Sequence, residues 1–159
     1  MKKIIFCTLL MSLLFFSCEK KEKNISIYSY SLLNDDVGDF KLNITEKGGV
    51  IGFEYLNKID TIGRLHLTYN KKLDVLITKA DTFYSIKKAY NLKEIKFKFY
   101  QRKVVKSHNR SFVFNEKYGL LSNLAFGADY LFIKDSISKI EKEVLFKGLF
   151  LQLNEINVE

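Results

Sequence analysis

A two-residue alternation of apolar and polar side chains recurs along this chain and restricts its fold more than any other feature. The alternation is clearest between Glu94 and Tyr100, which read Glu-Ile-Lys-Phe-Lys-Phe-Tyr. Such a pattern is typical of a strand with one buried face. Similar runs predict further strands at 25–30, 39–44, 50–56, 64–69, 73–78, 111–115 and 130–134. Gly48 and Gly49 favour a tight turn between two of these runs and predict a hairpin there.

Helical patterns are confined to two segments. In Asp81–Leu92, three apolar residues recur at spacings of three and four, which favours a helix. Ser138 and Glu141 have the form of a capping box, so a second helix is expected to begin there. We expect this second helix to bury one stripe, Ile137, Ile140 and Val144. Gly148 is expected to end it, and Leu149–Leu153 to form a last strand. The expected class is therefore α+β, a mainly antiparallel β-sheet with one or two short helices.

The segment between Asn115 and Asp129 has no clean period and contains two glycines. Loops longer than about 12 residues are often functional. We therefore expect either a long loop here, such as a lip over a hydrophobic cavity, or a buried turn of helix at Leu120–Leu124.

The N-terminus has the order of an export signal. Lys2 and Lys3 precede an apolar run, Ile4–Phe16, and a strongly charged segment follows at once after Cys18. The 13 apolar residues span only about 20 Å as a helix, whereas the hydrocarbon core of a bilayer is about 30 Å thick. Small residues do not occupy both positions of an A-x-A-like site, which a conventional secretory signal would need.

Leu14-Phe15-Phe16-Ser17-Cys18 resembles the lipobox of bacterial lipoproteins, in which cleavage occurs just before an invariant cysteine. Phe15 and Phe16 depart from the smaller residues that are more usual there. The resemblance implies cleavage after Ser17 and acylation of Cys18, for example by palmitate. It divides the chain into a signal peptide (1–17), a lipidated cysteine with a charged tether (18–24) and a single globular domain (25–159). Glu19 after the cysteine favours the outer membrane over the inner membrane, by resemblance to known sorting rules.

Removal of residues 1–17 would discard Cys7, leave Cys18 as the sole thiol and preclude an internal disulfide. The formal net charge would fall from +8 to +6 with the loss of Lys2 and Lys3. For an exported protein, such a charge favours anionic lipid, acidic glycan or an envelope protein as partner rather than nucleic acid. Solubility alone is the alternative explanation.

The most basic segment is Glu94–Arg102, which as a strand would carry Lys96, Lys98 and Arg102 on one face. Two interpretations are open. Lysines protect an edge strand from aggregation, and they also suit a ledge that faces membrane head groups.

Residue patterns for catalysis or metal binding are weak. His66 lies in an alternating run and His108 in a basic turn, without the spacing of a zinc site. Asp35-Asp36 lacks the remainder of a calcium loop, and no G-x-S-x-G elbow or phosphate-binding loop is present. We therefore expect no catalytic, metal or cofactor residues and no enzyme. The expected function is a membrane-anchored binding or assembly module of the cell envelope. The alternative is an inhibitor or immunity-type lipoprotein that neutralises an enzyme.

Overall fold

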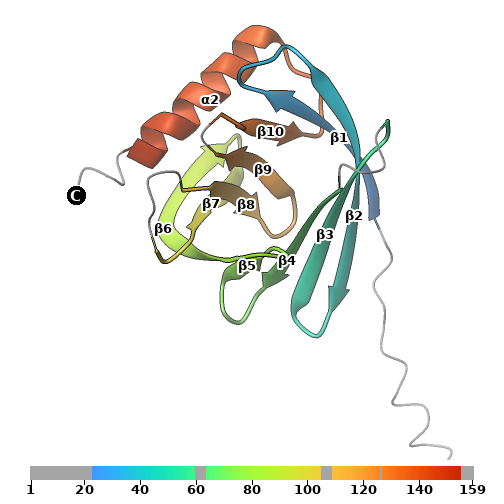
Figure 1. Cartoon of the computed structure of the whole chain (residues 1–159), viewed down its shortest axis with the longest axis vertical. Coiled ribbons are helices and arrows are strands. Elements are labelled where there is room, and N and C mark those ends of the chain that lie inside the picture. The colour runs from blue at the N-terminus through green and yellow to red at the C-terminus, as the bar shows by residue number, and fades with distance from the viewer. Residues whose placement is uncertain (1–22, 60–63, 105–108, 126, 155–159) are drawn as a thin grey trace, which may run out of the picture.

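Ten strands form one closed antiparallel barrel in the part of the chain that the structure describes (Figure 1). The structure is a computed structural model and describes residues 23–59, 64–104, 109–125 and 127–154. Each strand pairs with the next along the chain, and β10 pairs with β1 to complete the ring. The strands are β1 (Lys23–Ser31), β2 (Val37–Lys47), β3 (Val50–Asn57), β4 (Arg64–Asn70), β5 (Val75–Ile77), β6 (Thr82–Leu92), β7 (Ile95–Gln101), β8 (Ser111–Asn115), β9 (Gly119–Leu124) and β10 (Tyr130–Ile133).

Helix α2 (Lys139–Asn154) follows β10 and lies across the outside of the barrel (Figure 1). The predicted class, α+β with a mainly antiparallel sheet, is therefore confirmed. The predicted hairpin is also present, because Lys47 pairs with Val50. Gly48 and Gly49, between them, have φ angles of 59° and 79°, as a two-residue hairpin turn of matching twist requires.

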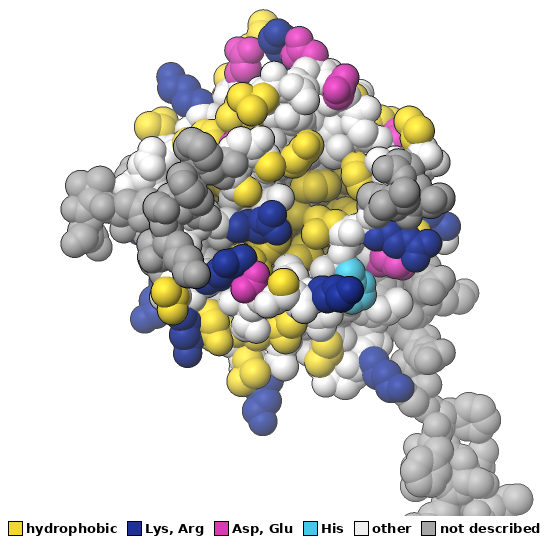
Figure 2. Space-filling model, viewed as in Figure 1, with side chains coloured by type: hydrophobic (Ala, Val, Ile, Leu, Met, Phe, Trp, Pro, Cys, Tyr) yellow, Lys and Arg dark blue, Asp and Glu magenta, His cyan; other side chains and the backbone are white. Residues whose placement is uncertain are grey.

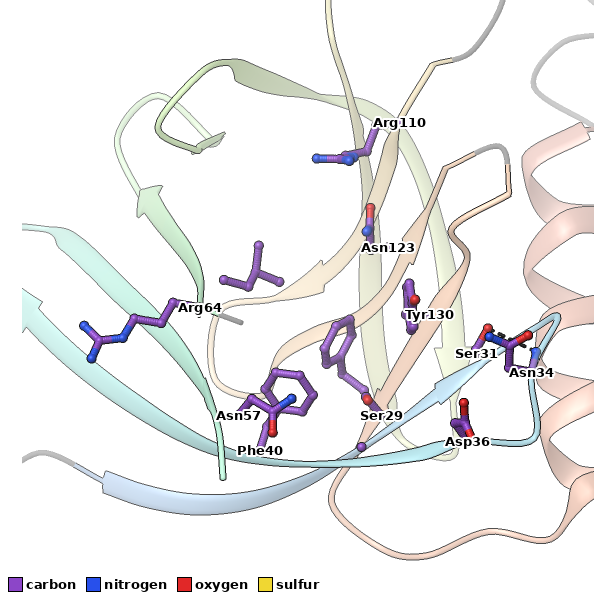
Figure 3. A pocket seen from close by; sticks show the side chains of 13 residues that line it. Ser29, Ser31, Asn34, Asp36, Phe40, Asn57, Arg64, Arg110, Asn123 and Tyr130 are labelled. Atoms are coloured by element: carbon purple, nitrogen blue, oxygen red, sulfur yellow. Dashed lines mark hydrogen bonds between the residues drawn. The ribbon is translucent and has the colours of Figure 1, made fainter. Parts of the chain in front are cut away.

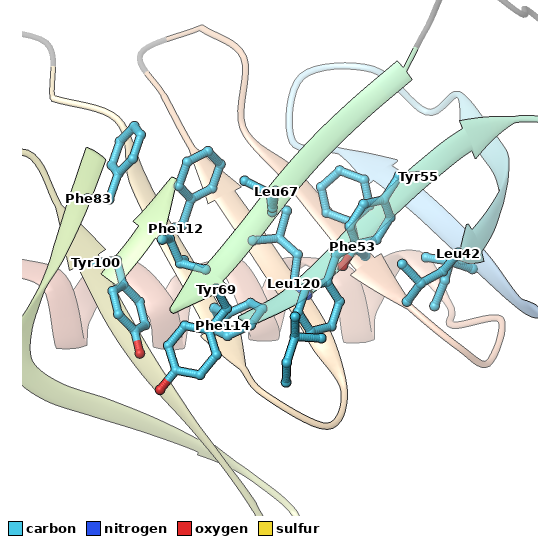
Figure 4. Packing of buried hydrophobic residues seen from close by; sticks show 14 residues of the cluster. Leu42, Phe53, Tyr55, Leu67, Tyr69, Phe83, Tyr100, Phe112, Phe114 and Leu120 are labelled. Atoms are coloured by element: carbon cyan, nitrogen blue, oxygen red, sulfur yellow. Dashed lines mark hydrogen bonds between the residues drawn. The ribbon is translucent and has the colours of Figure 1, made fainter. Parts of the chain in front are cut away.

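The interior of the barrel is filled by an inner core that is rich in aromatic side chains (Figure 4). Its rings meet edge to face: the Phe53 and Phe114 centroids are 5.0 Å apart, and the Phe83 and Phe112 centroids 4.7 Å apart. Each such pair contributes about 0.5–1.5 kcal/mol beyond the burial of its area. The inner core consists of Ile27, Leu42, Ile51, Phe53, Tyr55, Leu67, Tyr69, Leu76, Phe83, Tyr100, Phe112, Phe114, Leu120 and Phe132.

A second apolar layer, the outer core, lies between the barrel wall and α2. Neighbouring residues of one strand divide between the two layers: Phe112 and Phe114 belong to the inner core, and Val113 to the outer core. The outer core consists of Tyr30, Phe97, Phe99, Val113, Leu121, Leu124, Leu131, Ile133, Phe146 and Leu149. The strands beneath α2 are thus apolar on both faces, whereas other parts of the barrel wall face solvent.

The helix expected at Asp81–Leu92 is wrong, because this segment is strand β6 and pairs with both β5 and β7. Its register with β7 shifts between Ser85 and Ala89, and Lys87 within that irregularity has a φ of 63°. The irregularity sets four steps along β6 against two along β7, and this even difference leaves the alternation of faces in place. Phe83 belongs to the inner core, whereas Ile86 and Tyr90 pack against the outer core. Apolar residues from two faces of one strand thus produced the apparent helical spacing.

The segment expected as a loop or a turn of helix at 120–124 is strand β9. Leu120 is buried in the inner core, and Leu121 and Leu124 are buried in the outer core. A strand buried on both faces reads as a nearly continuous apolar run, so it has no period of two to be recognised. The hypotheses of a long loop and of a buried helical turn are both wrong here.

The predicted capping box is present at the start of α2. The Ser138 backbone N–H donates to Glu141 Oε2 at 2.8 Å, and the Glu141 backbone N–H donates to Ser138 Oγ at 3.3 Å. The helix does not stop at Gly148, however, and the strand predicted at Leu149–Leu153 is helical. A Cβ on Gly148 would lie 3.0 Å from the Tyr90 hydroxyl oxygen. The glycine therefore allows α2 to approach β6 closely rather than ending the helix.

The predicted buried stripe of α2 is largely wrong. Ile140 and Val144 are 73% and 62% exposed, and the helix instead buries Lys142, Phe146 and Leu149. Apolar residues occur on both sides of this helix, so the spacing of three and four fits two stripes equally well. Among the described residues, no helix combines the length and the apolar character needed to cross a membrane.

Candidate functional site

A pocket of about 520 Å³ opens at one end of the barrel, here called the pocket end (Figure 3). Because adjacent strands are antiparallel, the last residues of β1, β3 and β9 meet the first residues of β2, β4 and β10 at this end. The lining residues are Ser29, Ser31, Asn34, Asp36, Gly38, Phe40, Asn57, Arg64, Leu65, Arg110, Asn123, Tyr130 and Phe132. Figure 2 shows a hollow with a hydrophobic floor and with Lys and Arg side chains around its margin.

The floor of the pocket is continuous with the inner core. Phe40 and Phe132 meet edge to face with their ring centroids 6.0 Å apart, and the Tyr55 ring lies 5.3 Å from that of Phe132. Tyr55 is fully buried, and its hydroxyl oxygen accepts the Leu120 backbone N–H at 2.6 Å. Burial raises the pKa of the Tyr55 hydroxyl. The aromatic packing of the inner core therefore supports a rigid apolar floor.

Serines and a glycine shape the wall formed by β1 and β2. Ser31 Oγ accepts the backbone N–H groups of Leu33 and Asn34, at 3.2 and 3.3 Å, and so orders the loop after β1. Gly38 pairs with Ser29 across the two strands. A Cβ at Gly38 would lie only 2.4 Å from Ser29 Oγ, so a larger residue there would displace the wall of the pocket.

Three charged side chains line the pocket: Arg64 at the start of β4, Arg110 just before β8 and Asp36 just before β2. All three are exposed. Among the described residues, none of the three forms an ion pair. Arg102, near the same end, differs from them, because it pairs with Asp81 at 2.5 Å and lies over the Phe83 ring. The pocket margin therefore carries two guanidinium groups and one carboxylate, all available to a ligand.

Asn123 adds an unmet hydrogen-bonding group to the same wall. Its Oδ1 is buried without a hydrogen-bond partner among the described residues. A buried acceptor without a partner is costly, and binding sites are places where such a cost is relieved by water or ligand. Asn57, also in the lining, is engaged already, because its Oδ1 accepts the Ile59 backbone N–H at 2.9 Å.

At the opposite end of the barrel, hydrogen bonds on Asp74, the residue before β5, reach side chains of β4 and β7. Its Oδ1 accepts the Tyr69 hydroxyl at 2.9 Å and the Tyr100 hydroxyl at 2.7 Å, and its Oδ2 accepts Lys98 Nζ at 2.9 Å. Burial together with the bond to Asp74 raises the pKa of Tyr69 to about 12. Burial also raises the pKa of Asp74, but the hydrogen bonds from Lys98 and the two tyrosines outweigh it, and the net pKa is lowered.

Of the sites considered from the sequence, Asp36 lines the pocket and the others fall elsewhere. Cys18, the predicted lipidation site, and His108 lie outside the described residues. His66 is exposed on β4, with Nε2 3.4 Å from Thr68 Oγ1. No group of three His, Cys, Asp or Glu side chains in the described ranges is placed to hold a metal ion.

The basic segment at 94–102 is not an edge strand, because β7 pairs with β6 on one side and β8 on the other. Two of its three cations are engaged: Lys98 pairs with Asp74, and Arg102 with Asp81. Fewer cations of this segment are therefore left to face membrane head groups than the sequence suggested. Sequence reasoning did not find the pocket, since its residues belong to no local motif and only barrel closure brings them together.

Comparisons with protein-family models, with curated proteins and with solved structures found no match to this chain.

Proposed function

We propose that this chain is a lipid-anchored binding module of the cell envelope, which holds a small molecule at the pocket end of its barrel. The observation that carries this proposal is the open pocket of about 520 Å³, which has an apolar floor and a charged margin. Small-molecule sites are commonly concave, about 300–1,000 Å³ in volume, and mostly apolar with a few convergent polar groups. The inner core packs directly beneath this floor.

Binding suits the pocket better than catalysis. The described lining residues include no histidine, cysteine or lysine, and Asp36 is their one carboxylate. General acid–base chemistry needs a positioned proton donor or acceptor near the reacting atoms, often a histidine or a second carboxylate. We therefore propose that the protein holds its ligand unchanged.

The anchor in this proposal is an acyl group on Cys18. Its support is the lipobox-like segment Leu14–Cys18, followed by the charged residues of the tether. An anchor of this kind would hold the module at the envelope, on the outer membrane by the sorting resemblance of Glu19. Anionic lipid, glycan or an envelope protein would then be within reach of its basic surface.

The anchor is tested by metabolic labelling with an alkyne analogue of palmitate. Cys18→Ser should lose the label and retain the size of the unprocessed chain, because no thiol remains at the cleavage site. Cys7→Ser is the matched control and should be labelled and processed normally, since Cys7 lies within the segment to be removed. Full labelling of Cys18→Ser at the processed size would overturn the anchor.

The pocket is tested by native mass spectrometry of the full chain purified from its own membranes. We expect a small molecule bound to the wild-type protein and to Leu73→Trp, since Leu73 is 65% exposed at the opposite end. Leu65→Trp should lose that molecule, because the larger ring would occupy the pocket. Retention of the molecule by Leu65→Trp, or its absence from the wild-type protein, would overturn small-molecule binding.

An envelope inhibitor or immunity-type lipoprotein is the second candidate. One observation favours it: Ile140, Val144 and Leu151 form an exposed apolar ridge along α2, and exposed apolar patches often mark protein contacts. The two functions predict different sensitive variants. Inhibition of an envelope enzyme that is lost with Ile140→Asp and Val144→Asp, but kept with Leu65→Trp, would favour the inhibitor.

A further inference from the structure

We infer that the pocket takes a single-chain amphiphile with an anionic head group, its apolar chain directed toward the floor and its head group toward Arg110. This inference rests on the proposed function, because it assigns a ligand class to the same pocket. It is carried by the separation of apolar and charged groups within one cavity.

The apolar part of the ligand is inferred from the residues of the pocket floor. Phe40 and Phe132 present rings there, and Leu65 adds an aliphatic side chain that packs against the inner core. Phe132 is only 5% exposed, and Tyr55 beneath it is fully buried. The chain of the ligand therefore ends against packed aromatic rings and enters from the pocket end. Burial of each methylene strengthens binding by about fourfold.

The charge of the head group is inferred from the two arginines at the pocket margin. Figure 3 places Arg110 and Arg64 at different margins of the pocket, with the Arg110 guanidinium directed across the mouth and that of Arg64 turned away. A guanidinium group binds carboxylate or phosphate through two parallel hydrogen bonds. Arg110 is therefore the main head-group residue, and Arg64 adds a weaker attraction.

The carboxylate of Asp36 further restricts where the head group can lie. Asp36 lines the pocket from the loop before β2, and like charges repel. An anionic head group is thus directed away from Asp36 and toward Arg110. A cationic ligand would meet two guanidinium groups, and a neutral apolar ligand would leave both without a role.

The test uses the full chain, purified from membranes and reconstituted in nanodiscs of zwitterionic lipid. The probe is a palmitic acid that carries a photoreactive diazirine, and tandem mass spectrometry locates the labelled peptides. We expect label on the peptides that contain Phe40, Leu65 and Phe132. Arg110→Gln should weaken labelling by about tenfold, the loss typical of one charge-assisted contact. Arg64→Gln should weaken it less. Lys47→Gln, a change of the same charge on an exposed residue at the opposite end, should leave it unchanged.

Unlabelled competitors separate the parts of the ligand. Palmitate and hexadecyl phosphate should both displace the probe. The one that does so at the lower concentration identifies the preferred head group, carboxylate or phosphate. Hexadecanol lacks the charge, so displacement should require at least about a tenfold higher concentration of it. Inorganic phosphate should not displace the probe. Equal displacement by hexadecanol, or unchanged labelling of Arg110→Gln, would overturn the anionic head group. Displacement by inorganic phosphate would overturn the apolar chain.

Failure of this inference is distinguishable from failure of the proposed function. If the probe labels no pocket peptide while native mass spectrometry still shows a small molecule that Leu65→Trp loses, the ligand class is wrong and the binding module stands. If both signals are absent, the proposed function fails as well.

Discussion

Replacing Asp74 removes the acceptor on which two tyrosines at the end of the barrel opposite the pocket depend. Tyr69 and Tyr100 are 6% and 1% exposed, and both donate their hydroxyls to Asp74 Oδ1. Loss of an acceptor for a buried hydroxyl costs about 1–3 kcal/mol, and the lower half of that range applies because both hydrogen bonds are partly buried. The ion pair with Lys98 adds at most about 1 kcal/mol, because side-chain exposures of 46% and 38% leave it screened by water. We therefore expect Asp74→Gly to lower the free energy of unfolding by about 3 kcal/mol.

Glycine is the informative replacement because Asp74 has a φ of 50°, which an alanine would adopt only with strain. Asp74→Asn keeps an acceptor and tolerates the same backbone angle, so its expected cost is about 1 kcal/mol. Lys98→Met tests the ion pair alone and should also cost at most about 1 kcal/mol. Urea unfolding followed by circular dichroism measures all three. A cost of Lys98→Met equal to that of Asp74→Gly would show that the ion pair, and not the tyrosine hydrogen bonds, dominates the contribution of Asp74.

The same cluster predicts a dependence of stability on pH. The native pKa of Asp74 is lowered, so its contribution is complete above the unfolded value of about 3.9. The contribution is lost as the pH falls from there through the native pKa. Asp74→Asn should therefore show a smaller loss of unfolding free energy between pH 7 and pH 3 than the wild-type protein. An identical loss in both proteins would show that other carboxylates account for the acid sensitivity.

Three further changes probe α2 and are measured by urea unfolding. Gly148→Leu should cost about 2 kcal/mol, because its side chain would meet Tyr90, whereas the exposed neighbour change Lys147→Leu should stay within about 0.5 kcal/mol. Ser138→Ala should cost about 1 kcal/mol through loss of the N-cap, and no loss would contradict the role of the capping box. Lys142 is buried and pairs with Asp35 at 3.3 Å. Lys142→Met should cost at most about 1 kcal/mol, because an apolar side chain of similar length can replace a buried lysine; a cost above about 3 kcal/mol would show that this ion pair holds the helix.

The strands with one solvated face were predictable from the sequence, as Glu94–Tyr100 illustrates. The failures have identifiable causes. Apolar residues on both faces of β6, with Phe83 inside and Ile86 and Tyr90 outside, give it a false helical spacing. Burial on both faces removes the alternation from β9. In α2, two apolar stripes compete, and the choice between them depends on the outer core, which is assembled from distant strands.

The pocket was less predictable than the fold for a related reason. Arg64 and Arg110 belong to β4 and to the residue before β8, and neither lies in a recognisable motif. Their placement at one end follows from the register of the intervening strands and from closure between β1 and β10. Local sequence patterns specify neither the strand register nor the closure of the barrel. The sequence did predict the capping box and the glycine hairpin, whose determinants are a few residues apart.

The direction of β1 determines which end of the barrel lies near an N-terminal anchor. Lys23 pairs with Ile44 near the β2–β3 hairpin, whereas Ser29 and Ser31 line the pocket. At about 3.3 Å per residue, the strand carries the chain more than about 20 Å from its start to the pocket. A chain acylated at Cys18 would have a tether of only a few residues, each adding at most about 3.6 Å of reach. The attachment point would then lie at the end of the barrel opposite the pocket, which leaves the mouth free to face away from the bilayer and to load from the aqueous side.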